Sequence, residues 1–507
     1  MVLKAFFLNN NMKKIALLTA VFLLKLGSIY SQSAEEALLH FQENFSGTAR
    51  VSAMSGSYSA LGGDYGGLSI NPAGVGSFIK DNLGFTLGLN FNKSQSTYLG
   101  TEVNDGKTSF NLYSASMLWQ KTPSKKRQAK GWMSTGFGIG YNRQANYHSH
   151  IQYAGYNDEN SLTDWFAQNA QGTPESELAD DELSPHLYDS YLAYWSYLIN
   201  PDTTDANSYH SVMNNGGITQ GETIDIKGGK GDLSVTYGAD YKGKIHLGAS
   251  LNLPIINQTT KSSFTEEDKD DHIGKFNEFT YHKYIHTEGT GIQAKLGIIA
   301  LPKEYLRFSF AFHSPASVRF TDHYTFEIQS TAWGPQGIQD FTATSPDGNF
   351  EYKLVTPMKA VLGVGYRYKK LGYVTVDYEF TDFSQMRYNF GQYIEAEETV
   401  NRQINDNYGV MHTLKGGLEV KLMDHFFLRG GMQYHTDYEK DSAVDASGFG
   451  YSAGIGFVFD HLQFDFAMLN SGKKFGLTPY TLSSEQVPMV DVKLRNTQAM
   501  LTVGFIF

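Results

Sequence analysis

The sequence of 507 residues contains no cysteine, and it contains no hydrophobic run long enough to cross a bilayer as a helix. The absence of cysteine excludes disulfides, thiolate metal sites and cysteine nucleophiles. Residues 15–24 are apolar but fall short of the roughly 20 residues that a spanning helix needs. The mean hydropathy of −0.34 argues against a helical membrane protein. The formal net charge of −11 argues against nucleic acid as a partner.

Glycine and aromatic residues are abundant, with 51 Gly, 32 Tyr and 34 Phe. This composition suits a membrane β-barrel, which has aromatic girdles at both interfaces and strands that are apolar on one side only. The length alone would suggest several soluble domains. A single large barrel with long loops accounts for it as one unit.

The last twelve residues, 496–507, alternate between a greasy face and a mixed face and end in an aromatic residue. Side chains alternate across a strand, and a barrel wall has lipid on one side and the lumen on the other. This pattern is typical of the closing strand of an outer-membrane barrel, which the insertion machinery reads. We therefore interpret Phe505 and Phe507 as an assembly signal.

The first 31 residues resemble a secretory signal peptide, with Met12-Lys13-Lys14 as the charged start, an apolar core and a small-residue exit. Met12 is the expected true start, and cleavage after Ser31 is expected. A lipoprotein anchor is excluded because no cysteine follows the apolar core.

From residue 83 onward, apolar residues recur with period two over spans near ten residues, which indicates an all-β transmembrane barrel of about fourteen antiparallel strands. Most connections alternate between short turns and long loops, as expected when both termini lie in the periplasm. We place a kink at His313-Ser314-Pro315; splitting the strand there gives fifteen. The expected strands are 83–93, 109–120, 131–142, 231–240, 243–253, 289–300, 304–329, 352–368, 371–381, 409–422, 425–437, 448–459, 461–469 and 496–507.

The long outer connections are expected at 94–108, 143–230, 254–288, 330–351, 382–408, 438–447 and 470–495. The longest, 143–230, is expected to contain helices. Residues 266–271 form an acidic run that reads as a solvated loop face.

Residues 32–82 do not alternate, and we interpret them as an N-terminal plug inside the barrel. Residues 34–45 suggest a short amphipathic helix, and residues 47–77 are rich in small residues with turn signals at Gly62-Gly63 and Asn71-Pro72. A fourteen-strand barrel is wide enough to need filling. Asp377, Glu379, Arg429 and Asp465, if they face the lumen, are expected to hydrogen-bond this plug.

This stretch resembles the N-terminal hatch of the FadL/TodX family of outer-membrane transporters. The family's Asn-Pro-Ala stands here as Asn71-Pro72-Ala73, followed by Gly74 and preceded by a Gly-rich run. Residues 356–384 resemble the family's Pro-led strand, hairpin and Asp-Tyr … Thr-Asp-Trp-Ser segment, with Phe383 in place of Trp. Residues 414–434 are a third match. The resemblance implies a hatch-plugged barrel that transports hydrophobic molecules.

No catalytic constellation is present in the sequence, so we expect neither an enzyme nor a cofactor or metal site. The alternative of a haem ligand rests on four histidines, His148, His150, His282 and His286. A haem iron needs an axial His or Tyr in a dry pocket.

Two apolar stripes at helical spacing stand out within residues 143–230. Ser161 begins the first as a helix cap. The stripes either pack on each other over the barrel mouth or form an outer groove that captures ligand, as extracellular helices do in the family that the chain resembles. The groove residues would be Leu162, Trp165, Phe166, Tyr191, Leu192, Trp195 and Leu198.

We therefore expect passive uptake of hydrophobic small molecules, such as long-chain fatty acids, across a Gram-negative outer membrane by groove capture, lumenal binding and hatch rearrangement. The expected partners are the ligand, outer-membrane lipids and lipopolysaccharide, and the barrel assembly machinery. No nucleic acid is expected, and the protein is expected to be a monomer. Two alternatives stay open: a haemin-binding or adhesion receptor, and a structural barrel subunit of a secretion or surface-assembly complex.

Overall fold

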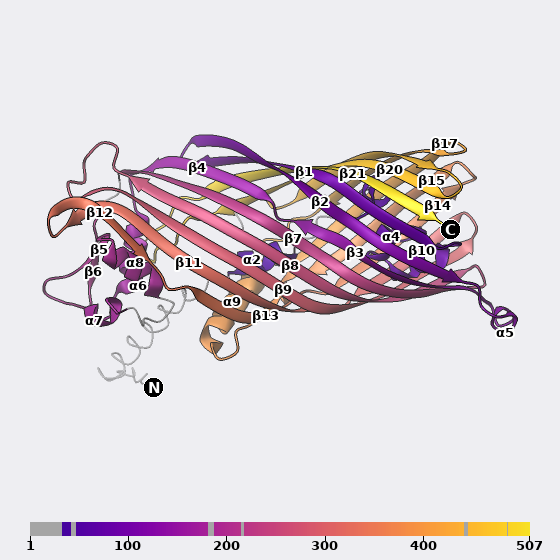
Figure 1. Cartoon of the computed structure of the whole chain (residues 1–507), viewed down its shortest axis with the longest axis horizontal. Coiled ribbons are helices and arrows are strands. Elements are labelled where there is room, and N and C mark those ends of the chain that lie inside the picture. The colour runs from indigo at the N-terminus through magenta and orange to yellow at the C-terminus, as the bar shows by residue number, and fades with distance from the viewer. Residues whose placement is uncertain (1–32, 42–46, 181–186, 214–216, 441–444, 484) are drawn as a thin grey trace, which may run out of the picture.

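The computed structural model describes residues 33–41, 47–180, 187–213, 217–440, 445–483 and 485–507, and its strands form a closed antiparallel barrel of fourteen strands (Figure 1). The signal peptide expected at residues 1–31 lies outside the described residues. The ring closes between the first and last strands, from Asn82 opposite Ile506 to Thr97 opposite Asp491. No helix in the described ranges is long and apolar enough to cross a membrane.

Each strand of the ring pairs with the next one along the chain, and two of the fourteen are interrupted and carry two labels. In ring order the strands are β1 (Asn82–Tyr98), β2 (Thr101–Lys121), β3 (Trp132–Asn146), β7 (Ile218–Tyr241), β8 (Ile245–Glu267), β9 (Phe276–Lys303), β10 with β11 (Leu306–His313 and Ser317–Gly334), β13 with β14 (Gly348–Val355 and Lys359–Tyr368), β15 (Gly372–Asp382), β17 (Val410–Met423), β18 (Phe426–His435), β19 (Gly448–Val458), β20 (Leu462–Leu477) and β21 (Val490–Ile506).

The two ends of the barrel differ (Figure 1). At one end, which we call the helical end, lie α6 (Leu162–Ala170), α7 (Glu175–Leu178), α8 (Tyr188–Trp195) and the short strands β5 (Ile199–Pro201), β6 (Tyr209–Ser211) and β12 (Gly337–Thr344). At the other, the turn end, strands are joined by short turns and α5 (Lys125–Gln128) projects. Apart from the segment before β1, the remaining elements are β4 (Ser149–Asn157), η4 (Phe383–Gln385), β16 (Arg387–Asn389) and α9 (Ile394–Asn407).

The barrel has apolar side chains on its outer face and polar side chains on its inner face, which is the reverse of a soluble protein. In β1, Phe85, Leu87 and Leu89 are exposed on the outer face. The neighbouring Thr86 and Asn90 are buried and face the lumen. The same alternation recurs around the ring, where outward Leu, Ile, Val, Phe and Tyr side chains form a continuous apolar surface. An apolar outer band around a polar interior is the signature of a membrane barrel.

The sequence-based strand count and the interruption at His313-Ser314-Pro315 are confirmed, since β10 ends at His313 and β11 begins at Ser317. A second interruption at residues 356–358, on the adjacent strand, was not predicted. The loops predicted at 94–108, 254–288 and 330–351 are wrong in large part, because the strands continue as hairpins. The first hairpin turns at Leu99-Gly100, where both residues have positive φ. Beyond the bilayer neither face meets lipid, so the apolar alternation that marks a strand disappears there.

The Gly-rich segment before β1 lies inside the barrel as α3 (Ala49–Ser52), α4 (Tyr65–Leu68) and η2 (Pro72–Ser77). Its backbone bonds to strands on different sides of the ring. The Ala49 N–H donates to Thr502 on β21 at 2.7 Å, and the Ser59 N–H donates to Asp377 on β15 at 2.9 Å. Lys295 on β9 donates to the Ser69 carbonyl at 3.2 Å. The segment thus spans the lumen as a hatch.

The Asn-Pro-Ala-Gly turn lies against the barrel wall. Asn71 caps η2 by accepting from the Ala73 N–H at 3.0 Å, and it donates to the Ser59 carbonyl at 2.9 Å. Two glycines of the wall make this approach possible. A Cβ on Gly297 would lie 1.9 Å from Asn71 Oδ1, and one on Gly248 would lie 2.3 Å from the Pro72 backbone.

The final residues close the ring. Phe505 pairs with Leu83 on β1 and with Leu462 on β20. The Phe507 N–H donates to the Asp81 carbonyl at 3.0 Å, and its side chain is exposed. Their role as an assembly signal stays a prediction.

Candidate ligand chamber and wall seam

A cavity of about 750 Å³ lies in the lumen on the helical-end side of the hatch. Its lining comes from α2 (Ala34–Phe41) and from strands around the ring, and it combines apolar, aromatic and charged side chains. We call this cavity the chamber. Among its lining residues are Leu38, Phe41, Ala145, Tyr147, Ile226, Lys230, Ala316, Val318, Glu379, Phe383, Tyr408, Lys415, Tyr438, Lys473 and Leu477.

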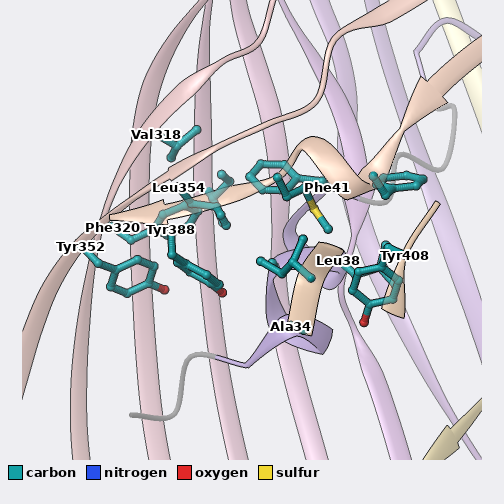
Figure 2. Packing of buried hydrophobic residues seen from close by; sticks show 14 of the residues in the cluster. Ala34, Leu38, Phe41, Val318, Phe320, Tyr352, Leu354, Tyr388 and Tyr408 are labelled. Carbon is teal, nitrogen blue, oxygen red and sulfur yellow. The ribbon is translucent and has the colours of Figure 1, made fainter. Parts of the chain in front are cut away.

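Helix α2 stands within the barrel, against an aromatic wall (Figure 2). Its buried side chains Ala34, Leu38 and Phe41 belong to one apolar cluster with residues of β11, β13, β16 and α9. Within that cluster the Phe320 and Tyr352 rings stack with centroids 5.2 Å apart. The helix therefore occupies space that a ligand in the chamber would share.

His40 on α2 is fully buried, and its ring stacks on Phe320 with centroids 4.8 Å apart. Burial, together with the charge of Lys230, lowers the pKa of His40 to about 3. The imidazole is therefore neutral in its docked position.

The hatch is fixed to the wall by a buried ion network. Arg50 of α3 donates to Glu419 from Nε at 2.9 Å and from Nη2 at 2.8 Å. Arg429 donates to the same Glu419 at 2.6 Å and to Asp465 at 2.5 Å. Two guanidinium groups and two carboxylates thus balance. Buried charges are tolerated only when paired in this way.

The expectation that lumenal charges hold the hatch is confirmed directly for Asp377, which accepts from the Tyr58 and Ser59 N–H groups at 2.8 and 2.9 Å. Glu379 instead pairs with Lys415 at 2.6 Å, and both line the chamber. Arg429 acts on the hatch through Glu419. One layer of wall charges therefore touches the hatch, and a second layer neutralises the first.

The barrel wall has a gap in its backbone pairing beside β2. Among the described strands, β2 pairs with β3 only over residues 114–121, and its residues 101–112 pair with β1 alone. Strand β4 pairs with β7. It lies on the lumenal side of β1, where Ser94 Oγ donates to the His150 carbonyl at 2.6 Å. We call the unpaired boundary between β2 and the β4–β7 pair the seam.

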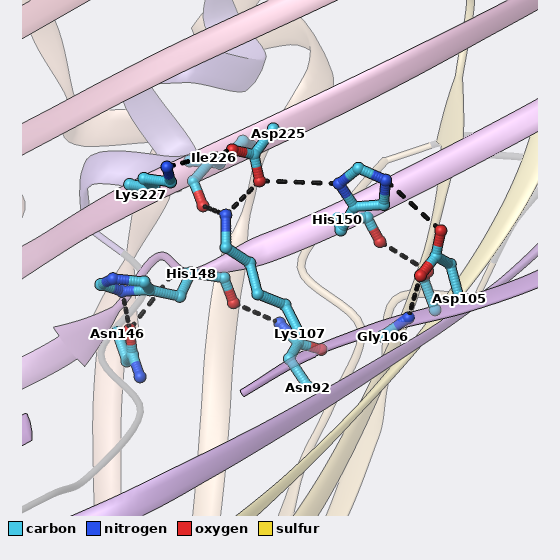
Figure 3. Close-up of polar contacts among 11 residues, drawn as sticks. Asn92, Asp105, Gly106, Lys107, Asn146, His148, His150, Asp225, Ile226 and Lys227 are labelled. Carbon is cyan, nitrogen blue, oxygen red and sulfur yellow. Dashed lines mark hydrogen bonds and ion pairs between the residues drawn. The ribbon is translucent and has the colours of Figure 1, made fainter. Parts of the chain in front are cut away.

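Side chains rather than backbone bonds close the seam (Figure 3). Lys107 on β2 reaches across to the Asp225 carboxylate and to the Ile226 carbonyl of β7. His150 lies between two carboxylates, 3.3 Å from Asp105 on β2 and 3.5 Å from Asp225 on β7. All four side chains are half-buried. Separating the seam therefore breaks ion pairs and a few hydrogen bonds from side chains to carbonyls, but no sheet ladder.

A second cavity, of about 370 Å³, lies at the seam. Its lining includes outward Phe110 and Ile255 together with Arg143 and His148. The chamber is lined by Ala145, Asn146 and Tyr147, so the two cavities lie on either side of the segment 143–148. At this point the strand carries a register shift between Arg143 and Ala145.

The residues proposed for an outer groove lie in the helical end, in one compact cluster. Leu162, Phe166, Leu192 and Leu198 are buried there among β8, β9, β11 and β20–β21 residues. The remaining members, Trp165, Tyr191 and Trp195, are less buried, and Trp195 is 46% exposed.

The expected capped helix start at Ser161 is present as a capping box with Asp164. The prediction that the acidic run 266–271 forms a solvated loop face is wrong in part. Glu266 is fully buried and accepts from Ser161 Oγ at 2.5 Å and from the Leu162 N–H at 2.8 Å. A carboxylate at a helix N-terminus is stabilised by the free N–H groups there. The sequence did not show that β8 runs far enough to bring Glu266 to α6.

The four histidines considered as haem ligands contact different partners. His148 hydrogen-bonds Asn146, and His150 is part of the seam. His282 and His286 contact Ser263 and Thr259 on the neighbouring strand, both at 2.9 Å. Within the described ranges, no group of three or more His, Asp or Glu side chains is arranged to hold a metal ion.

The sequence reasoning missed both α2 as part of the chamber and the seam. The seam has one local signal, Gly228-Gly229 and Gly231 on β7. A Cβ on Gly229 would lie 2.4 Å from Arg143 Nη2, and one on Gly231 would lie 2.2 Å from the Tyr141 ring. Three glycines in a strand indicate that another group approaches closely, but they do not identify that group.

A closed barrel with a lumenal hatch, a chamber and an apolar outer surface defines the chain as a plugged β-barrel of the membrane type. No family model and no curated protein matches the sequence. Solved structures, in contrast, match this chain in fold. A Pseudomonas aeruginosa FadL homologue matches with a TM-score of 0.56 and 10% identity, over 91% of this chain and 98% of that one. The P. putida toluene transporter TodX matches with a TM-score of 0.53 and 12% identity, over 92% and 99%. The chain therefore has the FadL fold, and the fold that the sequence motifs implied is confirmed.

Proposed function

We propose that this protein carries out passive uptake of hydrophobic small molecules, such as long-chain fatty acids, across the outer membrane of a Gram-negative cell. The observation that carries the proposal is the chamber, enclosed between the hatch and the helical end and walled by aromatic and aliphatic side chains. Its volume of about 750 Å³ lies in the range of small-molecule sites. The structural neighbours, one of them a toluene transporter, support a hydrophobic cargo.

The proposed route has three steps. The ligand is captured at the helical end, where Trp165, Tyr191 and Trp195 keep part of their surface exposed. The ligand then enters the chamber when α2 moves out of it. It then leaves through the seam into the bilayer, or past the hatch after the hatch rearranges. The seam favours the sideways exit, because a single layer of wall, made of residues 143–148 and the neighbouring parts of β7 and β8, separates the chamber from the lipid-side cavity.

The role of the chamber is tested by filling it. Ala316 is buried and lines the chamber, whereas Ser317 is the next residue and points outward. Ala316→Trp should reduce uptake of a fluorescent fatty acid, and Ser317→Trp should leave it unchanged. Equal uptake by folded Ala316→Trp and wild type would refute the proposal.

The sideways exit is tested by bridging the seam in a chain that has no cysteine of its own. Lys107→Cys with Asp225→Cys, joined by a short bifunctional thiol reagent, should block release from the chamber. Gln95→Cys with Glu102→Cys is the matched control, because these residues contact each other within the β1–β2 hairpin. Uptake that survives the seam bridge would assign release to the hatch.

The surrounding biology is proposed with the function. We propose that residues 1–31 are a cleaved signal peptide with Met12 as the start, that residues 32–82 act as the hatch domain of the barrel 83–507, and that Phe505 and Phe507 are read by the barrel assembly machinery. We also propose that the protein works as a monomer among outer-membrane lipids and lipopolysaccharide.

A further inference from the structure

The turn end of the barrel is basic along one side, although the chain as a whole carries a net charge of −11. The turns that join β2–β3, β7–β8, β9–β10 and β14–β15 are neighbours around the ring. We call their exposed basic side chains the basic arc: Lys121, Lys125, Lys126, Arg127, Lys130, Lys242, Lys244, Lys303, Lys369 and Lys370.

The basic arc has almost no acidic counterpart. Within residues 121–131, 241–245, 303–305 and 368–371, Glu304 is the one carboxylate, and it pairs with Arg367 at 3.5 Å. Asp240 lies just before the β7–β8 turn, where its half-buried carboxylate accepts from the Gly243 N–H at 2.9 Å. The rest of the turn end differs. There the turns contain Asp424 and Asp460. The excess of positive charge is therefore confined to one side of the barrel.

The arc lies immediately beyond an aromatic belt. Trp132 and Tyr241 pack edge to face with centroids 5.2 Å apart, and Lys242 lies 5.2 Å from the Tyr241 ring. Lys369 lies in the same way, 5.4 Å from the Tyr368 ring. Outward aromatic residues mark the level where hydrocarbon meets headgroups. At roughly 3.3 Å per residue, a basic residue one or two positions further on reaches the phosphate level.

The β2–β3 connection extends the arc. Lys125, Lys126 and Arg127 of α5 are wholly on the surface, and Figure 1 shows α5 projecting from the turn end. The Lys242 N–H donates to the Gly131 carbonyl at 2.7 Å, which joins this connection to the next turn. The positive groups of α5 and of β7–β8 therefore form one continuous surface.

We propose that the basic arc binds anionic phospholipids, through their phosphodiester headgroups, in the leaflet at the turn end. The alignment of the arc with the aromatic belt carries this assignment, because a soluble acidic partner would not require the charges to follow the membrane interface. Phosphate groups pair well with Lys and Arg clusters. Each basic residue close to an anionic bilayer surface contributes roughly a fivefold gain in affinity.

The test uses the full barrel in phosphatidylcholine nanodiscs that contain brominated phosphatidylglycerol, which quenches nearby tryptophans. Trp119 and Trp132 lie beside the arc. The wild type should prefer brominated phosphatidylglycerol over brominated phosphatidylcholine by roughly fivefold or more, because a single basic residue contributes about this factor. Changing Lys121, Lys125, Lys126, Arg127 and Lys130 to Gln removes half of the arc and should clearly reduce the preference.

The matched control removes the same charge elsewhere, by changing the exposed Lys93, Lys261, Lys269, Lys275 and Lys493 to Gln. This control should keep the lipid preference. No preference in the wild type, or an undiminished preference in the arc variant, would overturn the proposal. Inorganic phosphate at matched ionic strength should not displace the lipid. Displacement would make the arc a site for free phosphate and overturn the assignment to lipid.

Discussion

The hatch should loosen when Arg50 is replaced by Met, because this side chain joins the hatch to the buried ion network of the wall. In the wild type Arg50 and Arg429 balance Glu419 and Asp465. Arg50→Met deletes two hydrogen bonds to Glu419 and leaves the network with one uncompensated negative charge. The Glu419 side chain is only 3% exposed, so water cannot replace the lost partner fully.

The expected magnitude follows from this burial. Removing one partner of a buried ion pair costs about 3–5 kcal/mol. The Arg50 side chain is 21% exposed, which favours the lower limit. A loss of about 3 kcal/mol in hatch docking raises the population of the detached hatch roughly a hundredfold.

Hydrogen exchange measures this population directly. The Ser55 and Ser59 N–H groups donate to Ser452 and Asp377 on the wall, so their exchange should accelerate while strand amides of the barrel keep their protection. Lys421→Met is the control, since Lys421 pairs with the 94% exposed Asp424 and should change little. Adding Glu419→Gln to Arg50→Met restores the charge balance and should recover part of the protection. Unchanged exchange in Arg50→Met would refute the reasoning.

Three further predictions concern α2, the helical end and the seam. Because burial lowers the pKa of His40, its contribution to the docking of α2 is greatest above the ordinary histidine pKa of 6.5 and is smaller by about 2 kcal/mol at pH 5. Glu36 on the same helix has a pKa raised by burial and contributes in the opposite direction, so the His40 part is isolated by comparison with His40→Phe. The protection factors of α2 amides, which correct for the intrinsic pH dependence of exchange, should fall more from pH 7 to pH 5 in the wild type than in His40→Phe, and an equal change in both would refute the role of His40. Leu198→Ser, at a fully buried site, should lower the stability of the helical end by roughly 2–5 kcal/mol and make it sensitive to protease. Trp195→Ser should leave the helical end resistant and weaken capture of dilute ligand. Protease resistance in Leu198→Ser would show that Leu198 does not hold the helical end together. Lys107→Met should cost the closed seam about 1 kcal/mol and raise release from the chamber by roughly fivefold, measured as efflux of preloaded fluorescent ligand; unaltered efflux would mean that Lys107 does not hold the seam.

The barrel could be predicted because the strands show the alternation of apolar and polar residues that a membrane barrel requires. Apolar residues at every second position require a lipid-facing side, and this pattern indicated the strands. The interruption at His313-Ser314-Pro315 was placed partly to keep the strand number even, and the structure has it there. The prediction failed where lipid no longer selects residues. The β1–β2 and β8–β9 hairpins continue well past the apolar band, and their polar sequences looked like loops.

The candidate site was harder to predict because it is made of long-range contacts. Asn71 caps its own turn, a local feature that the sequence motif carries. The seam depends on Lys107 and Asp225, which come together only once the strand order is known. Glycine at 228, 229 and 231 showed that something approaches β7, but Arg143 and Tyr141 became visible as the cause only in the fold.

The chamber is the centre of the proposed uptake, and its natural occupant is the most direct test. The measurement is mass spectrometry of small molecules retained by the protein purified from its native membrane, with folded Ala316→Trp as the comparison. We predict an apolar molecule or fatty acid bound near one per barrel in the wild type and depleted in Ala316→Trp. A porphyrin in its place, or the same occupancy in both proteins, would contradict the account.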